Sequence, residues 1–192
     1  MMKKTILLAI LAIAAFIPSF AQEADKPESK SNTVLFEERG NSLIERTFYD
    51  IGAIPGVEFQ CIAIKNVQDG SMVGALRVIT HTYNITLKEG EEFIGTIDSD
   101  EMDAFIKALE YMNEVANTKE ATDIIIEYEF RSRDDVRFCL FSTRKKNWEL
   151  VVKPVLYRRN SSCYLKASKL PEIIELTKKA KAQLDEALGG QQ

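Results

Sequence analysis

The chain has 192 residues, of which 45% are hydrophobic, and its formal net charge at pH 7 is −4. This length is sufficient for one domain with a real hydrophobic core. A single His, three Cys and no Cys-x-x-Cys pair argue against a zinc site. We therefore expect neither a metal ion nor a cofactor.

The first 21 residues have the pattern of a secretory signal peptide. Two lysines precede an apolar segment over Thr5–Ile17, and the small residues Ser19 and Ala21 stand where a signal peptidase cleaves. The apolar segment is shorter than the roughly 20 residues needed to cross a bilayer. We expect cleavage near Ala21, a secreted or periplasmic location in a bacterial envelope, and no transmembrane segment in the mature chain.

A polar segment follows the cleavage site. Residues Gln22–Asn32 contain no large apolar side chain, so we expect a disordered leader there. The remainder, residues 33–192, is predicted to be a single domain made of two halves, at about 33–118 and 119–192.

Strand and helix signals occur in the same order in both halves. In the first half we expect strands at Leu43–Tyr49, Val57–Lys65, Met72–Tyr83 and Glu92–Ile97, and a helix at Asp98–Val115. In the second half we expect strands at Asp123–Arg131, Val136–Ser142, Trp148–Tyr157 and Ser162–Ala167, and a helix at Lys169–Leu188. The predicted fold class is α+β, with two ββββα units. Each antiparallel sheet is expected to be covered on one face by the C-terminal helix of its own unit.

The two predicted helices carry matching apolar positions. These positions are Met102, Phe105, Ile106 and Leu109 in the first helix, and Leu170, Ile173, Ile174 and Thr177 in the second. Both sets have the spacing of a helix with one buried face. Burial of each large aliphatic side chain contributes about 2 kcal/mol, so both faces need a partner. The apolar face of the preceding sheet is the expected partner.

A ββββα unit repeated twice resembles the whirly-type fold of single-stranded nucleic-acid-binding proteins. The resemblance covers Leu43–Leu188 and rests on the order of the elements. It implies two curved four-stranded sheets that pack together with the helices. It assigns no functional residues, because a shared fold does not imply a shared function.

The acidic run Asp98–Asp103 is the first candidate for chemistry. An EF-hand loop starting at Asp98 would need Gly at its sixth position and Glu at its twelfth, where this chain has Asp103 and Leu109. A helix start explains the run better, with Asp98 as N-cap and Glu101 as its capping partner. We therefore predict a capped helix start in place of a metal or catalytic site.

The second half is basic and the first half acidic. Residues 123–192 hold 14 Lys and Arg against 10 Asp and Glu, whereas residues 22–122 hold 9 against 19. Aromatic residues lie among the cations of the second half, and such mixtures bind single strands or other polyanions. The candidate ligand-binding residues are Arg137, Phe141, Lys153, Tyr164, Trp148 and Arg158. Solvated charges in hairpin turns are the alternative interpretation.

Three cysteines, Cys61, Cys139 and Cys163, lie in apolar or strand-like runs. We expect buried free thiols that pack as small hydrophobic side chains. A Cys139–Cys163 bridge across neighbouring strands is the alternative, and an odd count leaves one thiol free in either case.

These features favour an exported, non-enzymatic binding or interaction module. Its partner is unknown, and a protein or an anionic polymer of the cell envelope fits the charge pattern. A single-stranded nucleic-acid or polyanion binder is a second hypothesis, although export and the acidic mature chain argue against nucleic acid. A hydrolase that uses Glu127 and Glu129 is the third.

Overall fold

The computed structural model describes residues 31–84, 89–122 and 124–189. The predicted signal peptide and residues 22–30 of the predicted leader lie outside the described residues. None of the helices in the described part of the chain is long and apolar enough to cross a bilayer.

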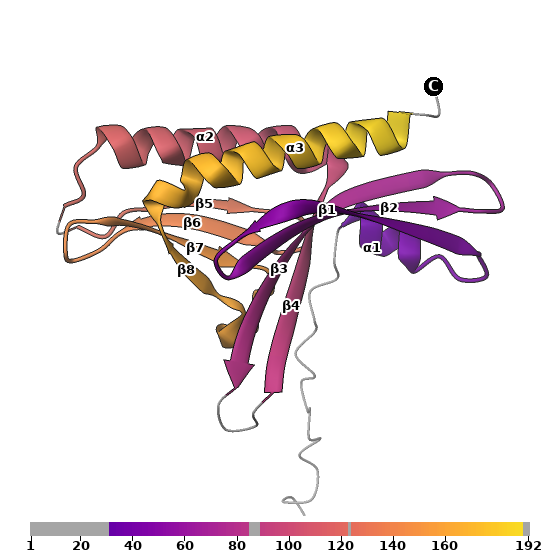
Figure 1. Ribbon diagram of the computed structural model, residues 1–192, viewed down its shortest axis with the longest axis horizontal. Coiled ribbons are helices and arrows are strands. Elements are labelled where there is room, and N and C mark those ends of the chain that lie inside the picture. Colours follow the sequence, from indigo (N-terminus) through magenta and orange to yellow (C-terminus); the bar gives the residue numbers. More distant parts are fainter. Residues whose placement is uncertain (1–30, 85–88, 123, 190–192) are drawn as a thin grey trace, which may run out of the picture.

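The described chain forms two four-stranded antiparallel sheets, with strand orders β1-β2-β3-β4 and β5-β6-β7-β8 (Figure 1). The strands of the first sheet are β1 (Ile44–Ile54), β2 (Val57–Asn66), β3 (Met72–Asn84) and β4 (Glu89–Asp98). Those of the second are β5 (Glu127–Arg131), β6 (Arg137–Ser142), β7 (Trp148–Lys153) and β8 (Cys163–Lys166). The helices are α1 (Asn32–Glu37), α2 (Met102–Thr118) and α3 (Leu170–Gly189). Single 3-10 turns occur at η1 (Ser99–Glu101), η2 (Arg159–Ser161) and η3 (Ala167–Lys169). The predicted α+β class with two ββββα units is confirmed.

The long helices cover exchanged sheets. Helix α2, which follows the first sheet, packs on the second, where the ring centroid of Phe105 lies 4.8 Å from that of Phe130 and 4.7 Å from that of Phe138. Helix α3, which follows the second sheet, lies across β1, β2 and β3 of the first (Figure 1). There the Lys179 ammonium donates a hydrogen bond to the Ile51 carbonyl at 2.7 Å. The expectation that each helix covers its own sheet is therefore wrong. Helical periodicity indicates that a face is buried but does not indicate which sheet buries it.

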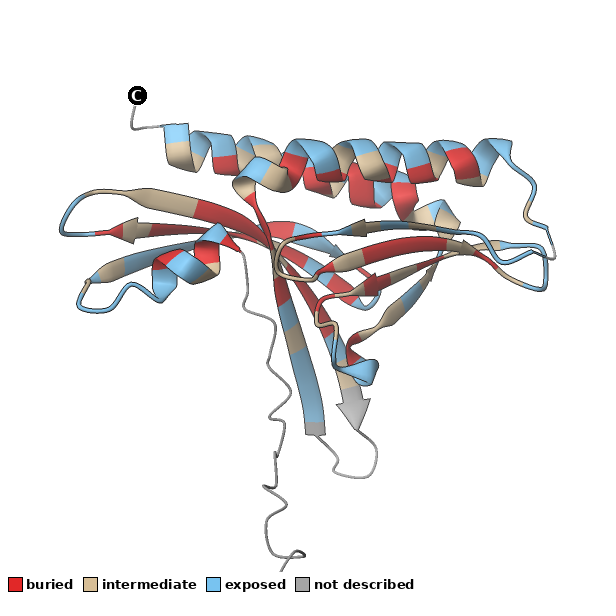
Figure 2. Cartoon of the chain, turned by 180° about the vertical axis from the view of Figure 1, so that it is seen from behind, coloured by how far each residue is buried: buried red, intermediate tan, exposed pale blue. Residues whose placement is uncertain are grey.

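One hydrophobic core joins the two halves. Its fully buried members come from both sheets and both long helices, among them Leu76, Phe105, Leu140 and Ile173. The buried stripes of the two helices lie toward the sheets, and their outer faces are exposed (Figure 2). The halves are therefore parts of one packed domain.

A short helix that the sequence did not predict covers part of the other face of the first sheet. Phe36 of α1 packs with Ile62, Ile64 and Ala75 in a second, smaller cluster. Ser31 is the N-cap of α1, with its hydroxyl accepting from the Val34 N–H at 3.4 Å, and Asn32 is the first helical residue. The last two residues of the predicted disordered leader, Ser31 and Asn32, thus belong to the folded part of the chain.

Several strand boundaries differ from those predicted; β4, for example, starts at Glu89 and not at Glu92, and β5 starts at Glu127 and not at Asp123. Two other differences have a visible cause in the chain. Strand β1 continues past Tyr49 to Ile54 through an irregularity between Asp50 and Gly52, where the backbone φ of Gly52 is 153°. The strand predicted to end at Tyr157 ends at Lys153 instead. Pro154 follows at once, and proline has no N–H with which to extend the ladder.

Gly95 of β4 lies in close contact with the second half of the chain. A Cβ atom at this position would overlap the carbonyl oxygen of Pro154 and would lie 2.6 Å from a methyl group of Val136. Both contacts belong to the second half of the chain. The absence of a side chain at Gly95 therefore allows β4 to pack against the second sheet.

Substitution of Gly95 by Ala should destabilise the fold. Because backbone atoms must shift to admit the methyl group, we expect a loss of about 1–3 kcal/mol in the free energy of unfolding. Gly90→Ala in the same strand is the control, since its Cβ would meet only the Thr82 carbonyl oxygen, at 3.9 Å. Chemical denaturation of both variants measures the difference, and equal losses would contradict the close approach at Gly95.

Candidate functional site

The second sheet has one face that the helices do not cover. Side chains alternate between the two faces along each strand, and Phe138, Leu140, Leu150 and Val152 are fully buried on the helix side. The opposite side, called the open face below, carries the remaining strand residues. They are Glu127, Glu129 and Arg131 of β5, Arg137, Cys139 and Phe141 of β6, Glu149, Val151 and Lys153 of β7, and Tyr164 and Lys166 of β8. In the sequence, Tyr128, Phe130, Phe138 and Leu140 alternate with mostly charged residues, which is the period-2 pattern of strands with one covered and one solvated face.

A basic row crosses one end of the open face. Arg131 is opposite Arg137 in the ladder, and Arg137 is opposite Lys153. Like charges directly opposite each other are destabilising unless nearby carboxylates offset them. Arg137 pairs with Glu129 at 3.2 Å, and Arg131 pairs with Asp135. The row is therefore partly neutralised from within the chain.

The centre of the open face is less polar than its ends. Cys139, Val151 and Tyr164 are in register across β6, β7 and β8. Along this row Cys139 is buried, Val151 is half-buried and Tyr164 is 68% exposed. In the next row Phe141 stands between Glu127 and Glu149. The open face thus has a basic row at one end, and at the other end a row of mixed charge that contains Glu127, Phe141, Glu149 and Lys166.

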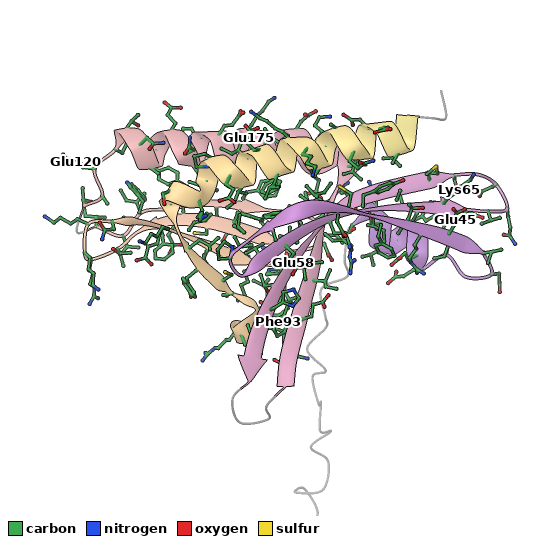
Figure 3. The ribbon with its side chains drawn as sticks, in the orientation of Figure 1. Glu45, Glu58, Lys65, Phe93, Glu120 and Glu175 are labelled. Atoms are coloured by element: carbon green, nitrogen blue, oxygen red, sulfur yellow. The ribbon has the colours of Figure 1, made fainter. Side chains whose placement is uncertain are left out.

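Four of the six candidate ligand-binding residues lie on the open face: Arg137, Phe141, Lys153 and Tyr164. Trp148 does not, because it is in register with Ser142 on the helix side of the sheet. Its indole N–H donates to the Lys119 carbonyl at 2.8 Å, and its ring centroid lies 6.0 Å from that of Tyr128. Trp148 lines a hollow of about 630 Å³ together with Glu120, which lies at the end of α2 (Figure 3). Glu149 and Lys166, at the edge of the open face, line the same hollow.

Arg158 is also separate from the open face. It lies in the connection from β7 to β8 and lines a hollow of about 430 Å³ against β4 of the first sheet, together with Glu91 and Phe93. Sequence proximity to Tyr157 and the other cations suggested a common surface. The early end of β7 at Lys153 instead directs this segment toward the first sheet.

The three thiols are free, as expected; Cys61 and Cys139 are buried, whereas Cys163 is only partly buried. Cys139 lies on the open face, whereas Cys163 is in register with Val152 on the opposite face and approaches the Pro55 carbonyl oxygen at 3.8 Å. The alternative of a Cys139–Cys163 bridge is therefore wrong. Burial raises the pKa of Cys61 to about 12 and that of Cys139 to about 11, so both thiols are protonated at neutral pH and are poor nucleophiles.

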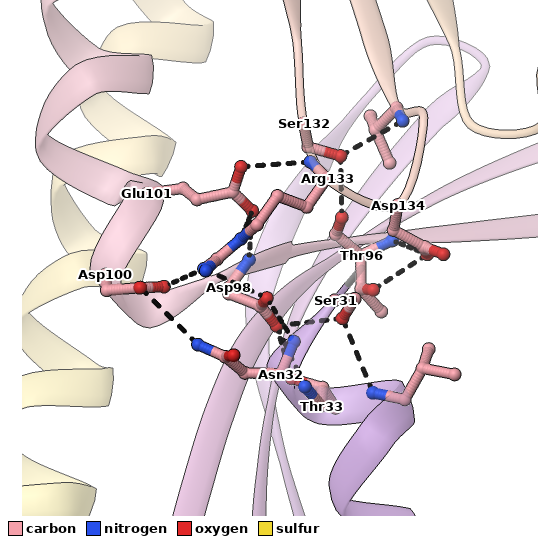
Figure 4. Close-up of polar contacts among 12 residues, drawn as sticks. Ser31, Asn32, Thr33, Thr96, Asp98, Asp100, Glu101, Ser132, Arg133 and Asp134 are labelled. Carbon is pink, nitrogen blue, oxygen red and sulfur yellow. Dashed lines mark hydrogen bonds and ion pairs between the residues drawn. The ribbon is translucent and has the colours of Figure 1, made fainter. Parts of the chain in front are cut away.

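The acidic run Asp98–Asp103 forms a polar junction among three parts of the chain (Figure 4). The prediction of a capped helix start is confirmed, because Glu101 accepts the Asp98 N–H at 3.2 Å. The Asp98 carboxylate, however, is directed at α1. It accepts from the Ser31 hydroxyl at 3.0 Å and from the Asn32 and Thr33 backbone N–H groups at 2.7 and 3.2 Å. Asp98 is 1% exposed, and its partners lie more than sixty residues away in sequence.

Arg133, in the turn between β5 and β6, joins the second half to this junction. Its guanidinium pairs with Asp98 at 3.1 Å, with Glu101 at 3.5 Å and with Asp100. Its backbone N–H donates to Glu101 at 3.0 Å. The carboxylates of the run are therefore occupied by structural contacts. Their role is to fix α1, the start of α2 and the β5–β6 turn relative to one another.

The carboxylates of the hydrolase hypothesis are neighbours on one strand. Glu127 and Glu129 both project from β5 onto the open face, and Glu129 is paired with Arg137. Glycoside hydrolysis requires two carboxyl groups that face each other across the scissile bond. This arrangement does not provide such a pair.

The chain matches no protein-family model, no curated protein and no solved structure.

Removal of the Asp98 charge should destabilise the fold through the polar junction. In Asp98→Asn the side chain can no longer accept all of its hydrogen bonds, so we expect a loss of about 2–3 kcal/mol in the free energy of unfolding. Asp100→Asn is the control, because Asp100 pairs with the same Arg133 but its side chain is 58% exposed. Its loss should stay below about 1 kcal/mol. Urea titrations of the two variants test the ranking, and a reversed order would refute the structural role assigned to Asp98.

Proposed function

We propose that the protein is an exported, non-enzymatic binding module that contacts an envelope partner through the open face of its second sheet. The observation that carries the proposal is the uncovered strip around Tyr164. An antiparallel sheet can remain solvated on one face, but that face is then usually polar. Here a 68% exposed tyrosine stands beside the half-buried Val151, between a basic row and a row of mixed charge.

The composition of the open face supports a macromolecular partner over a small ligand. Tyr and Arg are enriched among the residues that dominate binding at protein interfaces, and a polar rim commonly surrounds a less polar centre. Small-molecule sites are concave and enclose most of the ligand. The open face is a sheet surface with charges on both sides of an aromatic strip, which fits an extended partner with complementary charges.

The basic row favours a second candidate function. Arg131, Arg137 and Lys153 stand side by side across three strands, and such a row suits a polymer of regularly spaced negative charges. The resemblance of the element order to the whirly-type fold points to the same class of ligand. Export would make the ligand an anionic polymer of the envelope instead of a nucleic acid.

A photo-crosslinking amino acid placed at Tyr164 should capture the partner in the native host. We expect a discrete adduct in the envelope fraction, because position 164 lies at the centre of the proposed surface. Tyr157 is the control, since it is 69% exposed but lies outside the open face. Identical adducts from both positions would contradict the assignment of the surface. Recovery of the mature chain from the cytoplasm would contradict the proposed location.

Titration with a heparin-like polymer and with a labelled oligonucleotide at two salt concentrations tests the second candidate. If the basic row binds polyanions, Arg137→Ala/Lys153→Ala should weaken binding and lower the salt slope by about two, because two fewer counterions are released. Lys107→Ala/Lys145→Ala removes the same charge from exposed positions outside the open face and is the control. Flat titrations of the wild-type protein would discard this candidate and leave the first unaffected.

A further inference from the structure

The outer edge of β1 is a second exposed feature, independent of the open face and its ligand. Strand β1 is an edge strand of 11 residues, and most of its side chains between Glu45 and Asp50 are exposed. Its main contacts within the described residues are with β2 and α3. Long, exposed edge strands invite pairing with another strand, and proteins usually shorten, cover or interrupt them.

The ladder identifies which backbone groups of β1 point outward. The Val67 N–H donates to the Leu43 carbonyl at 2.9 Å, so the polar backbone groups of Leu43, and of every second residue after it, are directed at β2. The backbone groups of Ile44, Arg46, Phe48 and Asp50 are therefore directed away from the sheet. Beyond Asp50 the edge is closed, because Lys179 of α3 occupies the Ile51 carbonyl. The segment available for pairing is Ile44–Asp50.

The other edges are less suited to pairing. At β4 the outward N–H of Thr96 already donates to Asp134 at 2.9 Å. Strand β8 has only four residues. At β5 the residues with outward backbone groups are Glu127, Glu129 and Arg131, and antiparallel pairing of two copies centred on Glu129 would oppose two carboxylates. The connection from β7 to β8 also lies near Glu91–Ile94 of β4, so β1 is the edge best suited to pairing.

The sequence of β1 is complementary to itself in one register. When two antiparallel copies are centred on Phe48, Arg46 of each copy is opposite Asp50 of the other, and the two Phe48 rings are opposite each other. Thr47 is then opposite Tyr49 on the second face, a β-branched and aromatic pair. Registers centred on Arg46 or on Asp50 oppose like charges instead. Phe48 is 49% exposed, so its pairing would remove apolar surface from water.

The geometry points to a symmetric homodimer in which the β1 edges of two copies pair antiparallel about Phe48 and join their first sheets into one eight-stranded sheet. Residues 46–50 of both copies form the ladder. The two-fold axis makes every contact except the central Phe48 pair occur twice, as in other closed dimers. A ladder of this length buries less surface than a typical permanent interface, so the dimer forms at micromolar and higher concentrations.

Charge reversal tests the register. Arg46→Asp and Asp50→Arg should each weaken dimerisation about tenfold or more, because each change turns two attractive cross-strand pairs into repulsive ones. The double variant Arg46→Asp/Asp50→Arg should dimerise again, since it restores both pairs in reverse order. An equimolar mixture of the two single variants should form a heterodimer, because one copy then carries only aspartates and the other only arginines at these positions. Analytical ultracentrifugation over a concentration series measures all four samples.

The same variants separate pairing from folding. Within one chain Arg46 donates to Glu37 at 2.6 Å and Asp50 accepts from Gln60 at 2.9 Å, and the double variant restores neither contact. A purely structural role would therefore leave the double variant as impaired as the single ones, which would overturn the proposal. Glu127→Arg at the β5 edge is the matched control and should leave the dimer intact. A wild-type chain that stays monomeric up to millimolar concentration, or a dimer abolished by Glu127→Arg, would also overturn it.

Discussion

The exchange of helices between the two sheets is the constraint on which the rest of the structure depends. Each half makes its own sheet from local hairpins, but neither half can bury the apolar face of its sheet without the helix of the other half. Helix α2 packs on the second sheet through the contacts of Phe105 with Phe130 and Phe138. In exchange, α3 packs on β1, β2 and β3 of the first sheet. Burial of apolar area is the main favourable term in folding, so neither half alone retains its driving force. The two halves repeat the same order of strands and helix, but they share one hydrophobic core and are stable only together.

The polar junction stabilises the same arrangement from its edge. Asp98 ends β4 and leads into α2, and it also holds the start of α1 and the guanidinium of Arg133. A buried carboxylate with several donors is favourable only if all of its partners are in place, because an unpaired buried charge is costly. The junction therefore requires a defined position for the β5–β6 turn. This position brings β4 close to Val136, and the absence of a side chain at Gly95 leaves room for that contact.

The sequence predicts the elements well and their long-range partners poorly, for physical reasons. Period-2 alternation depends only on neighbouring residues, so the strand faces, including Arg137 and Phe141 on one side and Phe138 and Leu140 on the other, follow from it. The capping role of Glu101 is equally local. Helix α1 was missed because its stability comes from Asp98 and from the sheet beneath Phe36, far away in sequence. Trp148 and Arg158 were grouped with the open face by proximity along the chain. Trp148 is directly followed in β7 by Glu149, and since successive side chains point to opposite faces, Trp148 lies on the helix side while Glu149 lies on the open face. Arg158 lies elsewhere because β7 ends before Pro154.

The two sheets differ in what the exchange leaves exposed. The strands of the first sheet have 10 to 13 residues and those of the second have 4 to 6. A helix that lies across β1 to β3 covers the middle of long strands, so the outer part of β1 extends beyond it. Helix α2 covers one face of the second sheet, where Phe138, Leu140, Leu150 and Val152 are buried and the outer residues Tyr128 and Leu165 are partly buried. No described helix lies on the other face. The first sheet thus keeps an exposed edge and the second an exposed face. Because an edge offers backbone hydrogen bonds and a face offers side chains, the two surfaces can contact different partners at the same time.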